Sequence, residues 1–199
     1  MKVIFDFDDV LFYNTKLFKE HMYSCLEKAG VPRDESESFY KETRGERKLH
    51  GNQFSLKGFI ATLLEKKEIK TVSGKKIYED ILGKIKNSLN TELIEIVKKV
   101  GKDNCYLVSN GDIEYQADKV RESGIEELFR EFYPIPGTKK EIVEEICQRH
   151  KDEPVIFIDD RPYYFEDLDM EKCKNLKTVL YDENGLEKVC DAIKSAENI

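Results

Sequence analysis

Two aspartates, Asp6 and Asp8, follow the short apolar run that opens the chain. In an extended segment alternate side chains share a face, so the two carboxylates are expected to point the same way, with Phe7 on the other side. Like charges held a few ångströms apart repel one another, so either one carboxyl group stays protonated or a cation lies between them. The pair therefore suits a site that binds a metal ion and attacks an anionic group.

Other polar residues follow two later apolar runs, Ser109-Asn110-Gly111 after the first and Asp159-Asp160 after the second. Between them, Lys139 and Lys140 open a predicted helix, where the helix dipole disfavours cations. Each segment alone has a plain structural interpretation, as a turn, a helix cap or a solvated strand end. Together they predict one site, because chemistry collects beyond the carboxyl ends of parallel strands.

The elements that would position these residues fall into two parts. After a strand at residues 2–6, apolar residues recur at helical spacing from about Asn14 to Asn90, which predicts an all-helical insertion. From Thr91 onward, short apolar runs alternate with helices, which predicts a parallel sheet with helices on both faces. The later strands are expected at residues 105–108, 155–158 and 177–180, and the stretch after Gly124 as a short helical piece ending near Phe132.

Composition excludes several classes of protein. With 199 residues and 40% hydrophobic content, the chain can fill an ordinary core. Its net charge of −7 disfavours nucleic acid polymers and membrane surfaces as partners. Five scattered cysteines without a C-x-x-C pair predict neither a disulfide framework nor a zinc ribbon, and no run approaches the roughly 18 apolar residues of a membrane span. Without a signal peptide pattern, we expect a complete, cytoplasmic protein.

The four polar segments resemble, in order and spacing, the motifs of the haloacid dehalogenase superfamily of phosphatases and phosphotransferases. Those motifs are Asp-x-Asp, a Ser or Thr, a Lys at a helix start and paired acids. The resemblance implies an α/β fold with a Rossmann-like parallel sheet, a core domain of residues 1–13 and 91–199, and a first-type helical cap of residues 14–90. Asp9 stands where the family often has glycine, so the resemblance does not fix the backbone conformation of this turn.

The resemblance also implies a role for each acid. Asp6 would be the nucleophile that attacks phosphorus and becomes an aspartyl phosphate. Asp8 would protonate the leaving oxygen and later take a proton from water, which favours phosphate esters over carbon–halogen substrates. Asp160 would hold Mg²⁺ together with Asp6 and the backbone carbonyl of Asp8, while Asp159 would support the ion through water or a hydrogen bond.

For the substrate phosphate, the resemblance implies three further groups. The Ser109 hydroxyl and the Asn110 backbone amide would hold the phosphoryl oxygens, and Lys139 would neutralise the charge that develops on the nucleophile and the transferring group. Lys140 is the alternative lysine. The resemblance favours Lys139, because the following pattern, with Ile142 and Val143 as the first buried helix residues, then matches the family's register better.

The function implied is a Mg²⁺-dependent phosphohydrolase acting on a small phosphorylated metabolite. A phosphotransferase or phosphomutase of the same superfamily would use the same residues, and a non-enzymatic phospho-acceptor or binding domain is the third alternative. The sequence leaves open whether the chain is a monomer or a homodimer.

Substrate choice is expected to reside in residues 14–90, where a polar segment runs from Arg44 to Asn52. This segment could bind a second anionic group, but we expect a solvated loop after a helix at residues 34–43. Arg161, Tyr163 and Tyr164 are expected to be structural, the arginine as an ion-pair partner and the tyrosines in packing. The three histidines lack the spacing of metal ligands.

Overall fold

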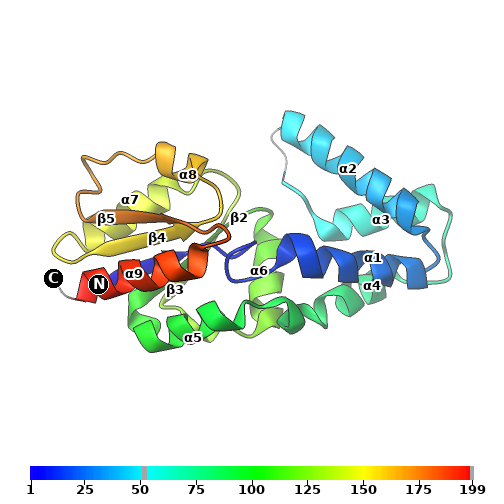
Figure 1. Ribbon diagram of the computed structural model, residues 1–199. Coiled ribbons are helices and arrows are strands. Elements are labelled where there is room, and N and C mark those ends of the chain that lie inside the picture. The colour runs from blue at the N-terminus through cyan, green and yellow to red at the C-terminus, as the bar shows by residue number, and fades with distance from the viewer. Residues whose placement is uncertain (51–52, 198–199) are drawn as a thin grey trace.

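The computed structural model describes residues 1–50 and 53–197, in which five parallel strands form one sheet (Figure 1). The strand order is β3-β2-β1-β4-β5, so the chain winds outward from β1 in both directions. The strands are β1 (Lys2–Phe5), β2 (Cys105–Asn110), β3 (Glu131–Ile135), β4 (Val155–Asp159) and β5 (Leu176–Leu180). This all-parallel order confirms the predicted fold class.

Alternation along the buried strands divides the core into two layers. Val3 and Phe5 point to the face covered by α5 (Thr91–Val100), α6 (Ile113–Ser123) and α9 (Gly185–Glu197). Ile4 points to the opposite face, which α7 (Lys140–Arg149) and the short α8 (Tyr163–Glu166) cover. Because Asp6 follows Ile4 by two residues, its side chain is directed toward the α7 side.

Four helices from the first half of the chain form a separate body beside the sheet (Figure 1). Local sequence sets one helix start and one helix end: Ser55 caps α3 by accepting a hydrogen bond from the Gly58 amide, and Gly30, with φ of +93°, follows the end of α1. The helices are α1 (Lys19–Lys28), α2 (Arg33–His50), α3 (Leu56–Lys66) and α4 (Gly74–Leu82), preceded by a π-helical turn, η1 (Asn14–Phe18), and followed by a 3₁₀ turn, η2 (Ile85–Ser88).

The helical piece predicted after Gly124 is wrong beyond its first turn. A 3₁₀ turn occupies Glu126–Leu128, but Glu131–Ile135 is the edge strand β3, paired in parallel with β2 from Tyr106 to Asn110. All five β3 residues are only half-buried, and Pro134 lies among them, as an edge strand allows. Glu131 and Pro134 also interrupt the continuous apolar run that identifies the central strands.

The loop predicted from Arg44 to Asn52 is wrong for most of its length. Helix α2 continues to His50, so residues 44–50 are helical, while residues 51–52 lie outside the described part of the chain. Lys, Arg and Glu have high helix propensity, and this outweighs the single Gly45 in the segment.

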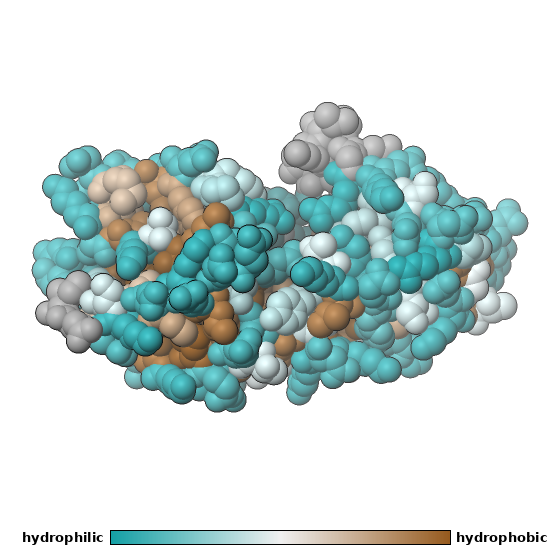
Figure 2. Space-filling view, in the orientation of Figure 1, coloured by the Kyte–Doolittle hydropathy of each residue, from teal (hydrophilic) through white to brown (hydrophobic). Residues whose placement is uncertain are grey.

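The surface is mostly hydrophilic over the helical body, and apolar residues are visible mainly around β4, β5 and α9 (Figure 2). Within residues 1–50 and 53–197, no helix combines the length and the apolar character that a membrane span requires.

Candidate active site

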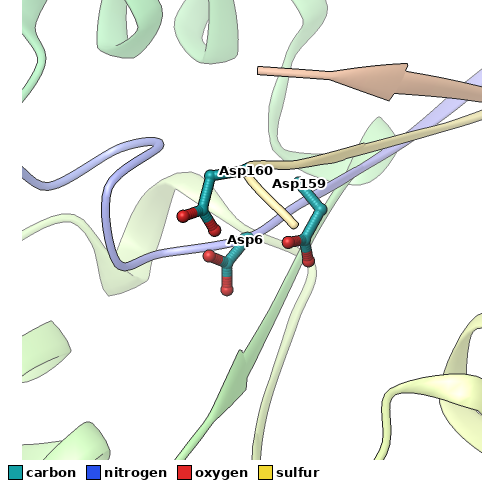
Figure 3. Close-up of side chains that lie close together, drawn as sticks. All are labelled: Asp6, Asp159 and Asp160. Atoms are coloured by element: carbon teal, nitrogen blue, oxygen red, sulfur yellow. The ribbon is translucent and has the colours of Figure 1, made fainter. Parts of the chain in front are cut away.

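Three carboxylates converge where the two central strands end (Figure 3). Phe5 pairs with Ile158, so the next residues along each strand, Asp6 and Asp159, are neighbours, and the Asp6 amide donates to the Ile158 carbonyl at 3.0 Å. Asp160 follows directly. Oxygen atoms from Asp6, Asp159 and Asp160 lie within 4.8 Å of one another, so the structure brings together three of the predicted metal-site acids.

Lys139 lies against these carboxylates from the start of α7. Its ammonium group contacts an Asp6 carboxylate oxygen and lies 2.6 Å from Asp159 Oδ2, and the lysine side chain is 1% exposed. Lys140 turns away, with its Nζ 2.9 Å from Glu144 Oε1 near the surface. Of the two candidate lysines, Lys139 is therefore the one beside the acids.

The electrostatics of the acid cluster follow from burial. Desolvation raises the pKa of Asp6 to about 7. The Lys139 ammonium group offsets only part of this rise, and the negative charge of Asp159 acts in the same direction as desolvation. Desolvation also raises the pKa of Asp160 to about 6, against the opposing effect of Arg161. The Lys139 pKa is raised, since two carboxylates outweigh the cost of burying the ammonium group. A cation added here would favour the ionised carboxylates.

The structure places Asp8 differently from the expected extended run. Strand β1 ends at Phe5, and Asp8 lies in the turn that follows, where its carboxylate faces α6 instead of α7. Lys119 Nζ lies 2.5 Å from Asp8 Oδ1, and Gln116 Nε2 donates to Asp8 Oδ2 at 3.1 Å. Asp6 and Asp8 nevertheless line one small pocket, so the pair shares a site without sharing a face.

Gln116 links the polar segment Ser109-Asn110-Gly111 to Asp8. Its amide oxygen accepts from the Ser109 hydroxyl at 3.1 Å, while its nitrogen also donates to the Asn110 carbonyl at 3.1 Å. Ser109 is fully buried and does not line the pocket, whereas Asn110 does, with its side-chain amide donating to the Gly137 carbonyl. Phosphate binding by Ser109 and Asn110 stays a prediction, and in this structure only Asn110 faces the pocket.

Gly111 gives a test of this network. A Cβ atom at Gly111 would lie 2.4 Å from Gln116 Nε2, so Gly111→Ala must displace the Gln116 side chain and loosen Asp8. We expect kcat/KM for a phosphate ester to fall about tenfold or more, because Gln116 must shift, and the melting temperature to fall as well, because Gly111 has a φ of +158° that residues with a side chain rarely adopt. Gly137→Ala is the matched control, because its Cβ would meet no atom within 4 Å. Equal kinetics of the two variants would contradict a role for Gln116.

Sequence reasoning missed the contribution of α6. Gln116 and Lys119 are 3% and 1% exposed, three residues apart on one helical face, and both reach Asp8. Their spacing was visible in the sequence, but a Gln and a Lys on a helix are usually solvated, so only the fold reveals their burial.

The residues after the acid pair also take part in the site. The Arg161 amide donates to Asp159 Oδ1 at 2.9 Å, and its guanidinium lies 3.7 Å from Asp160, as expected of an ion-pair partner. Tyr164 packs its ring 4.6 Å from Lys139 Nζ and lines the same small pocket. Packing was predicted for this tyrosine, but not its contact with the lysine.

Asp9 resolves the question of the first turn. It has a φ of +60°, in the left-handed region where glycine is common and aspartate is tolerated. Its carboxylate accepts from the Thr15 amide at 2.8 Å and from the Thr15 hydroxyl at 2.5 Å, which stabilises the turn.

The donor set fits Mg²⁺. Both Asp159 oxygens are engaged, by Lys139 and by the Arg161 amide, whereas the Asp160 carboxylate makes no hydrogen bond to any described residue. Asp6 and Asp160 therefore offer hard oxygen ligands close to one another, and Asp6 also lines a small pocket; Mg²⁺ prefers oxygen ligands of this kind.

Comparison with known proteins gives one family and one fold. Residues 3–163 match the family profile described as haloacid dehalogenase-like hydrolase. A search of the curated proteins gave no match.

Solved structures with the same fold include the HAD-hydrolase YfnB from Bacillus subtilis, which was solved with bound magnesium. It has 15% identity and a TM-score of 0.60, over 96% of this chain and 97% of that one. A haloacid dehalogenase-like hydrolase from Burkholderia xenovorans has 14% identity and a TM-score of 0.66, over 92% and 86%. A protein described as a β-phosphoglucomutase from Thermotoga maritima has 20% identity and a TM-score of 0.53, over 96% and 91%.

Proposed function

The chain belongs to the haloacid dehalogenase-like hydrolases, and from this premise we propose that it is a magnesium-dependent phosphohydrolase acting on a small phosphorylated metabolite. The observation that carries the proposal is the acid cluster of Asp6, Asp159 and Asp160 around the buried Lys139, with Asp8 at the edge of the same pocket. This arrangement supports attack by a carboxylate on an anionic group, because positive charge lies beside the attacking oxygen.

In the first step, a carboxylate oxygen of Asp6 attacks phosphorus and the bond between phosphorus and the leaving oxygen breaks. Lys139 is poised to stabilise this step, since its ammonium group contacts Asp6 and can follow the negative charge onto the phosphoryl oxygens. Asn110, which lines the same pocket, would hold those oxygens.

Asp8 would complete both halves of the reaction. It donates a proton to the leaving oxygen, and then accepts one from the water that attacks phosphorus and frees Asp6. The hydrogen bonds from Gln116 and Lys119 keep this carboxylate oriented at the pocket edge. An acid at this place supports ester cleavage over dehalogenation, because a halide leaving group needs no proton.

We assign the metal site to the Asp6 and Asp160 carboxylates and the Asp8 backbone carbonyl, with Asp159 in a supporting position. When bound, Mg²⁺ would offset the negative charge shared by the carboxylates and the substrate phosphate. Burial raises the pKa values of Asp6 and Asp160, and a bound cation would favour their ionised, metal-binding forms.

A pH dependence of metal binding follows. We expect Mg²⁺ to bind more tightly as the pH rises from about 6 to about 8, because only ionised carboxylates ligate the ion and the pKa values of Asp6 and Asp160 are raised to about 7 and about 6. Below those values, each displaced proton lowers the apparent affinity by up to about tenfold per pH unit.

Isothermal titration of the metal-free protein with MgCl₂ measures this dependence. Asp160→Asn should bind more weakly and with a shallower pH slope, whereas Asp191→Asn, an exposed change on α9, should match the wild type. A wild-type affinity that is constant across this pH range would contradict the metal assignment.

We further propose that residues 14–90 act as the cap that encloses the leaving group. The cleft beside the acid cluster is lined from both bodies, by Phe18 and Tyr40 on one side and Asn110 and Gln116 on the other. A cleft enclosed between two bodies would admit a small metabolite and exclude a folded phosphoprotein.

The proposal is tested with p-nitrophenyl phosphate and a panel of metabolite phosphates. We expect hydrolysis with Mg²⁺, loss of activity with EDTA, and recovery when excess Mg²⁺ is added. One free phosphate per ester consumed supports a hydrolase, whereas isomerised ester with little free phosphate would point to a mutase. A stable phosphorylated chain without turnover would contradict both activities.

A further inference from the structure

The small pocket at the acid cluster opens into the larger cleft. Asp8, Asn110 and Arg161 line both, so a phosphate ester held at Asp6 must pass its leaving group between these residues toward the helical body. The far side of the cleft is therefore where the rest of the substrate would be recognised.

On the far side of the cleft, two cationic side chains, Lys19 and Arg44, lie over the ring of Tyr40. Lys19 Nζ lies 5.1 Å from the ring centroid of Tyr40, and Arg44 Cζ lies 5.9 Å from it. Arg44 also donates to the Tyr40 hydroxyl at 3.1 Å. Since Tyr40 is 9% exposed, its fixed ring holds both flexible side chains at the cleft wall.

Neither cation is neutralised by a described acid. Among the side chains that the structure describes, which do not include those of residues 45–50, no carboxylate pairs with the charged group of Lys19 or Arg44. The chain has an excess of acids, and the cap cations Arg33 and Lys67 are both paired. Of the other cations lining the cleft, Lys119 is paired with Asp8 and Arg161 lies near Asp160. The far wall thus keeps two positive charges available to a ligand.

We propose that the substrate is a phosphate monoester whose leaving group bears a second anionic group, a carboxylate or another phosphate, which binds between Lys19 and Arg44. This inference rests on the proposed phosphohydrolase activity and names its substrate class. Two cations at the wall of one cleft attract the same anion together, because the cleft walls reduce solvent screening.

Matched esters test the proposal. Three series with two to six carbons are compared with Mg²⁺ at constant ionic strength: ω-hydroxyalkyl phosphates, ω-carboxyalkyl phosphates and alkanediol bisphosphates. For the wild type, we expect kcat/KM at the best chain length to be at least tenfold higher for a charged ester than for its neutral partner, mainly through KM. The carboxylate and bisphosphate series show which anion is preferred.

Variants locate the effect. The Lys19→Met/Arg44→Met double variant should reduce the charged-to-neutral ratio of kcat/KM to near one, and Arg44→Lys should keep part of the preference. Lys66→Met is the matched control, because Lys66 also lies over an aromatic ring of the cap, Phe39 at 4.2 Å, but does not line the cleft. Arg44→Lys keeps the test informative if the double variant does not fold.

The two proposals fail in distinguishable ways. If the wild type hydrolyses the neutral and charged series equally well, or if the double variant keeps the full preference, the second anion site is wrong and the phosphohydrolase stands. If no ester in any series is hydrolysed while the protein is folded and Mg²⁺ is present, the proposed function itself fails.

Discussion

Replacing Asp6 with asparagine should abolish turnover, with kcat falling by at least about 10⁴-fold, because the amide oxygen is a poor nucleophile and a neutral metal ligand. The fold should survive the change. Burial raises the pKa of Asp6 to about 7, so the ionised carboxylate is costly to hold above that pH, and asparagine keeps an oxygen that can accept from Lys139. We therefore expect a melting temperature at pH 8 equal to or above that of the wild type.

Initial rates with p-nitrophenyl phosphate and thermal unfolding, measured on the same preparations, check this result. Asp191→Asn is the matched control, since this exposed residue of α9 lies outside the small pocket that Asp6 and Asp8 line and outside the larger cleft. Activity of Asp6→Asn within tenfold of the wild type would remove the nucleophile assignment.

Lys139→Met should be damaging to both activity and stability. The substitution leaves Asp6 and Asp159, 5% and 0% exposed, as neighbouring buried carboxylates without their cation. Breaking a buried ion pair in this way typically costs about 3–5 kcal/mol of unfolding free energy. Loss of the positive charge beside the transferring phosphoryl group should lower kcat by about 10²-fold or more.

Lys140→Met is the control that separates the two adjacent lysines. Lys140 pairs with Glu144 near the surface, so its removal should cost at most about 1 kcal/mol and leave kcat within a few-fold of the wild type. Urea unfolding and steady-state rates with saturating Mg²⁺ measure both quantities. If Lys140→Met were the more damaging change, the lysine assignment would be reversed.

The meeting of site residues at the carboxyl ends of the strands was predictable, because the sequence signals for these strands are local. Continuous apolar runs identify β1, β2 and β4 as buried parallel strands, and the residues directly after such runs must meet at one edge. That rule alone brings Asp6, Ser109 and Asp159 to the same end of the sheet, as the structure has them.

The partners of Asp8 were not predictable in the same way. Alternation places Asp8 with Asp6 only while the strand continues, and the strand ends at Phe5. Beyond it, tertiary contacts decide the orientation: Lys119 and Gln116 from α6 draw the carboxylate to the other side of the sheet. No pattern near residue 8 encodes a helix more than 100 positions away.

The edge strand β3 shows a further limit of sequence reasoning. Glu131 and Pro134 interrupt its apolar character, and its residues become strand-like only by pairing with β2. Its position nevertheless matters for the site, because the Gly111 amide donates to the Ile135 carbonyl at 2.8 Å and so anchors the turn that follows Asn110.

The central claim, that Asp6 carries the phosphoryl group, is tested most directly by trapping the acyl phosphate. The wild-type protein, quenched with borohydride during turnover of p-nitrophenyl phosphate with Mg²⁺, is digested and analysed by mass spectrometry. Reduction of an aspartyl phosphate converts the residue to homoserine, and we predict this change at position 6 and at no other aspartate. Homoserine at a different position, or its complete absence while the ester is being consumed, would contradict the account.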